Sequence, residues 1–249
     1  MSEINTSLLL ENQNFSTFEI TENFICIRFL DQNKERFELE FNLEKGTSFN
    51  TFLIRSNREL FIIHPPEKEY SKSINKLIST FFDQFDLNKI NIITGHINPK
   101  IIETIKTIST KFSNLTITCS NPGFKLISEL WNQKKIPNLT NFIDVQLPEI
   151  NVIKKELSLE LEKNLLELIP IPTARWPGGL IVYESNEEIL LSEKVFSAHI
   201  ASEDWSEKNR ISTEIDRKHF YDCLMAPMSN QIVSIAEKIS ELDIKTIAP

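Results

Sequence analysis

The stretch that most constrains the fold is an apolar run at residues 90–93, which ends in a short polar loop before Pro99. The run has the pattern of a buried strand, and Pro99 opens a segment with helical periodicity, since proline is well placed in a first helical turn. Loops that follow buried strands commonly carry the functional groups of α/β proteins. His96 lies in this loop, and a single histidine by itself indicates no particular chemistry.

The composition is typical of a soluble globular chain. It has 249 residues, of which 41% are hydrophobic and 25% charged, with a net charge of -8. This acidic balance argues against a nucleic-acid partner. The start lacks a signal-sequence pattern, and no apolar run approaches the roughly 20 residues that span a bilayer. Three widely spaced cysteines favour free thiols in a reducing compartment, so we expect a cytoplasmic chain without membrane insertion.

Periodicity predicts a mixed α/β fold. We expect a meander of four antiparallel strands at residues 24–30, 37–43, 49–54 and 60–63. A β-α-β-α-β-α run should follow, with strands at 89–94 and 115–119 and helices at 70–85, 99–112 and 121–131. The second half predicts strands near 142–145, 165–169, 180–183, 189–191 and 244–249, and a helical stretch at 213–242 broken near Pro227. Residues 1–23 should be irregular, and residues 24–249 should form one domain of two packed sheets with helices outside.

Familiar catalytic motifs are absent from the sequence. The histidines show no zinc-site spacing, and there is neither a nucleophile elbow nor a glycine-rich phosphate loop. His64 is expected to be a strand-end histidine rather than a ligand. Taken alone, the Arg-Trp-Pro-Gly-Gly turn at residues 175–179 indicates a loop pinned by a buried tryptophan.

Four stretches read together resemble the flavodiiron proteins, or A-type flavoproteins. Residues 46–54 (GTSFNTFLI) are similar to their GTTYNAYLI strand, and residues 175–177 (RWP) to their HWPD turn. Residues 194–199 (KVFSAH) resemble the DAFGxH segment, and residues 220–227 (FYDCLMAP) the YYFDCLMAP helix. The segments follow the family order from about residue 24 to the end of the chain. The most similar group is the cyanobacterial photosynthetic class.

The resemblance implies a metallo-β-lactamase-like αβ/βα four-layer sandwich, with an incomplete C-terminal end at Pro249. In the family this domain holds a non-haem diiron site that reduces oxygen, or nitric oxide in some members. A flavodoxin-like domain with FMN follows, and the photosynthetic class adds a flavin reductase domain that uses NAD(P)H; we expect both to be absent from this chain. Family members assemble head to tail, which implies a homo- or heterodimer with another flavodiiron subunit.

The resemblance also locates the family's metal ligands, and most of them are substituted here. The first ligand motif, H-x-E-x-D-H, and two later ligand positions correspond to His96, Asn98, Lys100, Ile101, Arg175 and Lys194. The final ligand histidine would follow Pro249. Iron needs imidazole and carboxylate donors, whereas a protonated lysine or arginine offers no lone pair and repels a cation. We therefore expect no catalytic residue, no bound metal and no diiron, FMN or NAD(P)H cofactor in this chain.

Three functions remain open. The chain can be a subunit of an NAD(P)H:oxygen oxidoreductase that is inactive alone and needs a partner with intact chemistry. It can instead be a non-catalytic assembly module whose Lys100, Arg175 and Lys194 gather in a cationic pocket, neutralised by acids such as Glu193 or by a small anion. A metal-dependent hydrolase on the same fold would need H-x-H-x-D-H, which the loop at His96 lacks.

Overall fold

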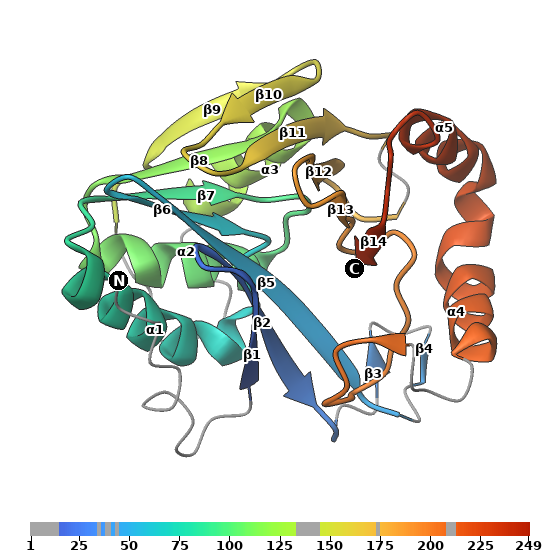
Figure 1. Cartoon of the computed structure of the whole chain (residues 1–249). Coiled ribbons are helices and arrows are strands. Elements are labelled where there is room, and N and C mark those ends of the chain that lie inside the picture. Colours follow the sequence, from blue (N-terminus) through green and yellow to red (C-terminus); the bar gives the residue numbers. More distant parts are fainter. Residues whose placement is uncertain are drawn as a thin grey trace.

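The computed structural model describes residues 15–33, 36–37, 41–42, 45–132, 145–172, 175–207 and 213–249. The larger sheet has seven strands in the order β1-β2-β5-β6-β7-β8-β9 (Figure 1). Its strands are β1 (Phe15–Thr21), β2 (Phe24–Asp31), β5 (Thr47–Ser56), β6 (Glu59–Ile63), β7 (Lys89–Ile93), β8 (Leu115–Ser120) and β9 (Glu149–Ile153). The pairs from β1 to β6 are antiparallel and those from β6 to β9 are parallel. The predicted change from a meander to a parallel α/β unit is confirmed.

The second sheet has five strands in the order β10-β11-β12-β13-β14. They are β10 (Leu157–Glu160), β11 (Leu165–Pro170), β12 (Leu180–Glu184), β13 (Ile189–Leu191) and β14 (Thr246–Ala248). Only the β13–β14 pair in this sheet is parallel. A separate two-stranded ladder joins β3 (Arg36–Phe37) to β4 (Phe41–Asn42).

Helices cover the outer faces of the two sheets. The helices are α1 (Ser71–Phe85), α2 (Pro99–Lys111), α3 (Asn121–Asn132), α4 (Glu214–Phe220) and α5 (Ser229–Ile239). One core cluster joins α1, α2 and α3 to the seven-stranded sheet, and another joins the end of α5 to the five-stranded sheet. A third cluster fills the space between the sheets. The result is the four-layer αβ/βα sandwich that the sequence predicts.

Alternation along β2 shows how the sequence builds these layers. Ile25 and Ile27 face the helices, while Phe24 and Cys26 face the second sheet. Side chains alternate between the faces of a strand, so a strand buried on both sides reads as a continuous apolar run. Cys26 and Cys119 are buried free cysteines, and Cys223 is half-buried.

Two predictions for the N-terminal part are wrong. Residues 15–21 are not irregular but form β1, which satisfies the backbone groups of the β2 edge and packs Phe15 against Phe29 with ring centroids 5.7 Å apart. The fourth meander strand is therefore β1 and not residues 37–43, whose described parts belong to the local β3–β4 ladder. Residues 1–14 and 38–40 lie outside the described residues.

In the second half, β9 and β10 were not predicted because most of their side chains are partly or fully exposed, which leaves no apolar run to recognise. Of the strand expected near 142–145, residues 142–144 lie outside the described residues and Val145 belongs to no strand. The break near Pro227 is confirmed, since a wide π-type turn (Tyr221–Met225) and a 3-10 turn (Ala226–Met228) separate α4 from α5.

Candidate functional site

The loop that follows β7 holds His96 in a fixed position. Thr94 Oγ1 donates a hydrogen bond of 2.9 Å to the His96 carbonyl oxygen. Two residues later, Asn98 caps α2, because its side-chain oxygen accepts from the backbone N–H of Ile101 at 2.8 Å and Pro99 takes the first helical position. His96 itself is buried, at 6% exposure. The cap and the turn therefore leave the imidazole ring little freedom.

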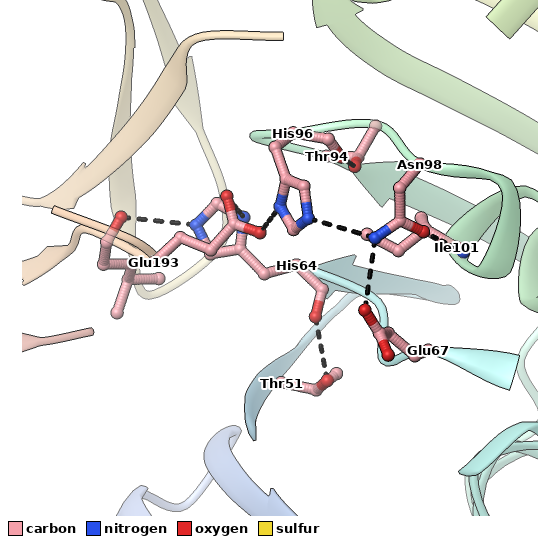
Figure 2. A network of polar contacts seen from close by, with 9 residues as sticks. Thr51, His64, Glu67, Thr94, His96, Asn98, Ile101 and Glu193 are labelled. Carbon is pink, nitrogen blue, oxygen red and sulfur yellow. Dashed lines mark hydrogen bonds and ion pairs between the residues drawn. The ribbon is translucent and has the colours of Figure 1, made fainter. Parts of the chain in front are cut away.

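Both ring nitrogens of His96 face polar side chains (Figure 2). Nδ1 contacts Oε1 of Glu193, which follows β13 in the second sheet. Nε2 lies 3.4 Å from the Asn98 side-chain nitrogen, which also donates to Glu67 Oε1 at 3.2 Å. His96 thus lies in a chain of contacts that joins the two sheets.

His64 is a second buried histidine at the same site. It follows β6, the parallel neighbour of β7, and is 3% exposed. Its Nε2 lies 3.3 Å from the Leu191 carbonyl oxygen, and its Nδ1 lies 4.0 Å from Oε2 of Glu193. Thr51 Oγ1 fixes the His64 backbone by donating to its carbonyl oxygen at 2.8 Å. The Glu193 carboxylate therefore lies between two histidines.

Burial and neighbouring charge act in opposite directions on these groups. Burial lowers the pKa of His64 because a charged imidazole is poorly solvated there, and the nearby Glu193 offsets only part of this effect. Burial alone would raise the pKa of Glu193, but the positive charge and hydrogen bond of His96 outweigh it and lower the pKa to about 2. The Glu193 carboxylate is consequently ionised over the whole physiological range.

Backbone geometry at the site is unusual. His64 and Glu193 both have a φ of 55°, and Phe196 has 64°, in the left-handed region that non-glycine residues rarely adopt. Gly95 permits the close approach of the two sheets, since a Cβ there would lie 2.4 Å from the Leu180 carbonyl oxygen and 2.7 Å from Oε2 of Glu193. Such outliers persist where the surrounding structure enforces them, often at functional sites.

The predicted cationic residues separate into two environments. Arg175 and Lys194 line a small cavity of about 30 Å³ together with His96, Glu193 and Trp176. That volume suits a water molecule or an ion of similar size. Both cations also lie near the Trp176 ring, with Arg175 Cζ 6.0 Å and Lys194 Nζ 5.8 Å from its centroid.

Lys100 does not line this cavity. Its Nζ lies 3.3 Å from Glu67 Oε2 and 2.5 Å from Glu69 Oε1. Partial burial would lower its pKa, but these two carboxylates raise it overall. Ile101, at another of the substituted positions, is 2% exposed and belongs to the core between α2 and the larger sheet. The structure therefore brings His96, Arg175 and Lys194 together, and links Lys100 to them through Glu67 and Asn98.

Sequence reasoning did not place His64 and Glu67 in the site. A usable signal existed for His64, because the carboxyl ends of adjacent parallel strands meet at one sheet edge and Ile63 pairs with Ile93 in register. Within the part of the chain that the structure describes, no group of three or more His, Cys, Asp or Glu side chains has the arrangement of a metal site. The described helices include none long and apolar enough to cross a membrane.

Comparison with known proteins decides the family. Residues 47–249 match the model of the family described as ODP family beta lactamase. The chain belongs to this family. It is 29% identical over 216 residues to diflavin flavoprotein A 3 of Synechocystis sp., and 31% identical over 231 residues to diflavin flavoprotein A 5 of Nostoc sp.. These matches cover 86% and 92% of this chain but only 34% and 38% of the relatives, so the chain spans little more than a third of their length.

Solved structures agree with this assignment. The metal-soaked Flv1 flavodiiron core from Synechocystis sp. superposes with a TM-score of 0.81 at 27% identity, covering 95% of this chain and 56% of that one. A fragment of the Nostoc diflavin flavoprotein A 5 gives a TM-score of 0.78 at 28% identity, covering 95% and 89%. The chain is a metallo-β-lactamase-like domain of the flavodiiron type, as the sequence resemblance implied.

Proposed function

We propose that this chain is the metallo-β-lactamase-like domain of a flavodiiron-type NAD(P)H:oxygen oxidoreductase, in which a network of polar contacts replaces the diiron site. In the assembled enzyme the reaction is the reduction of oxygen to water. This domain holds no iron, FMN or NAD(P)H, and it acts with another flavodiiron subunit in a head-to-tail homo- or heterodimer. The partner carries the intact chemistry.

The observation that carries this proposal is that both ring nitrogens of His96 already contact other side chains. Among the six family ligand positions that fall within this sequence, His96 alone offers an imidazole or carboxylate donor. Its Nδ1 contacts Glu193 and its Nε2 faces the Asn98 amide, so an iron ion would have to displace one of these partners. A diiron site needs several imidazoles and carboxylates, one of them bridging both ions. The donor set present does not fit two iron ions.

The charges in the cavity oppose a metal as well. Arg175 and Lys194 line it and bring two positive groups to the side on which His96 lies. At an effective dielectric constant of about 20, two unit charges of the same sign 4 Å apart repel by about 4 kcal/mol. A divalent cation would feel twice that repulsion from each group at the same distance. The ionised Glu193 offsets part of it, and that carboxylate is already bound to His96.

Elemental analysis tests the proposal. We expect far less than one iron per chain after expression in iron-supplemented medium and dialysis. The matched comparison is a variant in which the family's donors are restored by Asn98→Glu, Lys100→Asp, Ile101→His, Arg175→His and Lys194→Asp. This variant should retain more iron than the wild type. About two iron ions per wild-type chain would overturn the proposal.

A second candidate is a non-catalytic assembly module with an anion-binding pocket. The cavity beside Arg175 and Lys194 favours it, because two cations around a space of about 30 Å³ can hold a chloride-sized ion. The two candidates differ in oxygen consumption by a complex reconstituted with a full-length flavodiiron subunit. Activity that requires this chain supports the first, and complex formation without any gain in activity supports the second.

A further inference from the structure

The five-stranded sheet ends in an exposed edge strand. Strand β10 pairs with β11 on one side in an antiparallel register, and no described strand lies on its other side. It follows β9 in the chain and lies at the outer margin of the molecule (Figure 1). Alternate residues of such a strand direct their N–H and C=O groups away from the sheet, where another chain can pair with them.

Strand β10 has few of the features that usually block an edge. It contains no proline and no lysine, and its register with β11 shows no bulge. Three of its four side chains are exposed, and its one charged residue is Glu160. Its shortness is the one blocking feature present, and it limits any edge contact to a weak one.

An apolar row on β10 continues from the core to the surface. Leu159 and Leu161 pack against the cluster that fills the space between the two sheets. Leu157 lies on the same face of the strand, two residues before Leu159, but it is 50% exposed. A strand added beside β10 would cover Leu157 and extend this apolar face.

Charges of opposite sign flank β10. Lys154 and Lys155 come before the strand, whereas Glu160 and Glu162 lie at its end and just after it, and all four side chains are exposed. Of the ion pairs in the described part of the chain, none includes Lys154, Lys155 or Glu160. When two identical strands pair antiparallel, the start of each lies beside the end of the other. The lysines of one copy would therefore face the glutamates of the other.

We propose that a second copy of this chain binds along β10, edge to edge and antiparallel, about a two-fold axis. The two five-stranded sheets then form one continuous sheet through an isologous contact. Backbone hydrogen bonds and the burial of Leu157 hold the copies together, and the complementary charges set the antiparallel direction. Glu156, between the lysines and the strand, keeps its partner Lys238 in its own chain at 3.1 Å.

This contact is separate from the site described above. No residue of β10 lines the cavity beside Glu193. The proposed function is tested by iron content and oxygen consumption, and the edge contact by self-association. Either proposal can therefore fail without the other.

Sedimentation velocity over a range of protein concentrations tests the proposal. We expect a concentration-dependent step that doubles the mass. Leu157→Lys should weaken this step about ten-fold or more, because a lysine on an edge strand opposes pairing and the apolar contact is lost. Ile215→Lys is the matched control, since it makes the same kind of change at a position on α4 that is 80% exposed, and it should leave the step unchanged. Circular dichroism checks that both variants fold.

Charge reversal tests the antiparallel direction. One variant carries Lys154→Glu and Lys155→Glu, and the other carries Glu160→Lys and Glu162→Lys. Each should lose the step when alone, because like charges then meet across the contact. An equimolar mixture of the two should associate again, because each reversed end then faces the opposite charge.

Three results would overturn the proposal. The first is a wild-type chain that shows no concentration-dependent step. The second is an equal effect of Leu157→Lys and Ile215→Lys, which would place the contact between copies elsewhere on the surface. The third is a mixture of the two charge-reversed variants that associates no better than either variant alone.

Discussion

The Glu193 carboxylate contacts Nδ1 of His96 and so joins the segment after β13 to the loop after β7. By the sequence resemblance, His96 is the one family ligand position in this chain that keeps its residue type, and the structure places its Nδ1 against a carboxylate. The contact places a negative charge between two histidines at the edge where the two sheets meet. Its removal should therefore affect the stability of the whole domain.

Glu193→Gln should lower the free energy of unfolding by about 3 kcal/mol. Breaking a buried ion pair by removing one partner leaves the other unpaired and typically costs about 3–5 kcal/mol, and the partial exposure of Glu193 favours the lower end. Urea denaturation measures the change. Glu188→Gln is the control, because its pair with Lys245 is exposed and should contribute little. Equal losses for the two variants would contradict the role assigned to Glu193.

Stability should depend on pH through the same carboxylate. The folded-state pKa of Glu193 is about 2, below the ordinary value of 4.5, so between these values the unfolded chain binds a proton that the folded chain does not. The stabilisation is therefore present above pH 4.5 and is lost as the pH falls toward 2. Unfolding measured across this window should show a smaller pH dependence for Glu193→Gln than for the wild type.

His64 should add a second loss of stability at milder acidity. Burial lowers its folded-state pKa below 6.5, so at pH values below 6.5 the unfolded chain binds more protons than the folded one. Stability should thus begin to fall as the pH drops below 6.5. His64→Gln should remove this part of the pH dependence while leaving the part that comes from Glu193. Identical profiles for wild type and His64→Gln would contradict the assignment.

Gly95→Ala should destabilise the domain by about 1–3 kcal/mol or more, in the range of overpacked cores. An added Cβ would lie 2.4 Å from the Leu180 carbonyl oxygen, which belongs to a paired strand and cannot move freely. Gly123→Ala is the control, since its nearest contact would be 3.3 Å, to the Cys119 Cβ, and alanine favours a helix. Thermal unfolding of both variants measures the difference, and a Gly123→Ala loss as large as that of Gly95→Ala would contradict the argument.

The fold could be predicted from the sequence wherever burial produced a clear period. Strand β7 was recognised as a short apolar run that is buried on both faces, and helix α2 was recognised because its buried isoleucines recur at helical spacing. Strand β1 was missed because Phe15 is its one buried side chain and the others are partly or fully exposed. Periodicity reports only how a segment meets the core, so an edge strand held mainly by backbone hydrogen bonds leaves little trace in sequence.

The site could be predicted only in part, for a related reason. The resemblance located His96, Arg175 and Lys194, which line one cavity. It gave no information on His64 or Glu67, because neither lies at a family ligand position. Their place depends on the register between β6 and β7 and on the turn before α1, which tertiary packing determines. The pairing of Lys100 with Glu67 and Glu69 likewise follows from contacts more than 30 residues apart in the chain.

The last prediction concerns the cavity that Arg175 and Lys194 line. If this cavity holds an anion, sulfate or chloride should raise the melting temperature of the domain, since a ligand that binds only the folded state stabilises it. Arg175→Ala should abolish most of this rise, because Arg175 lines the cavity and its planar guanidinium group can donate two parallel hydrogen bonds. Lys100→Ala should retain the rise, because Lys100 lies outside the cavity and pairs with Glu67 and Glu69. Melting curves at increasing salt concentration, compared with a neutral osmolyte, provide the measurement. A rise that is the same in all three proteins would show that the anion acts elsewhere.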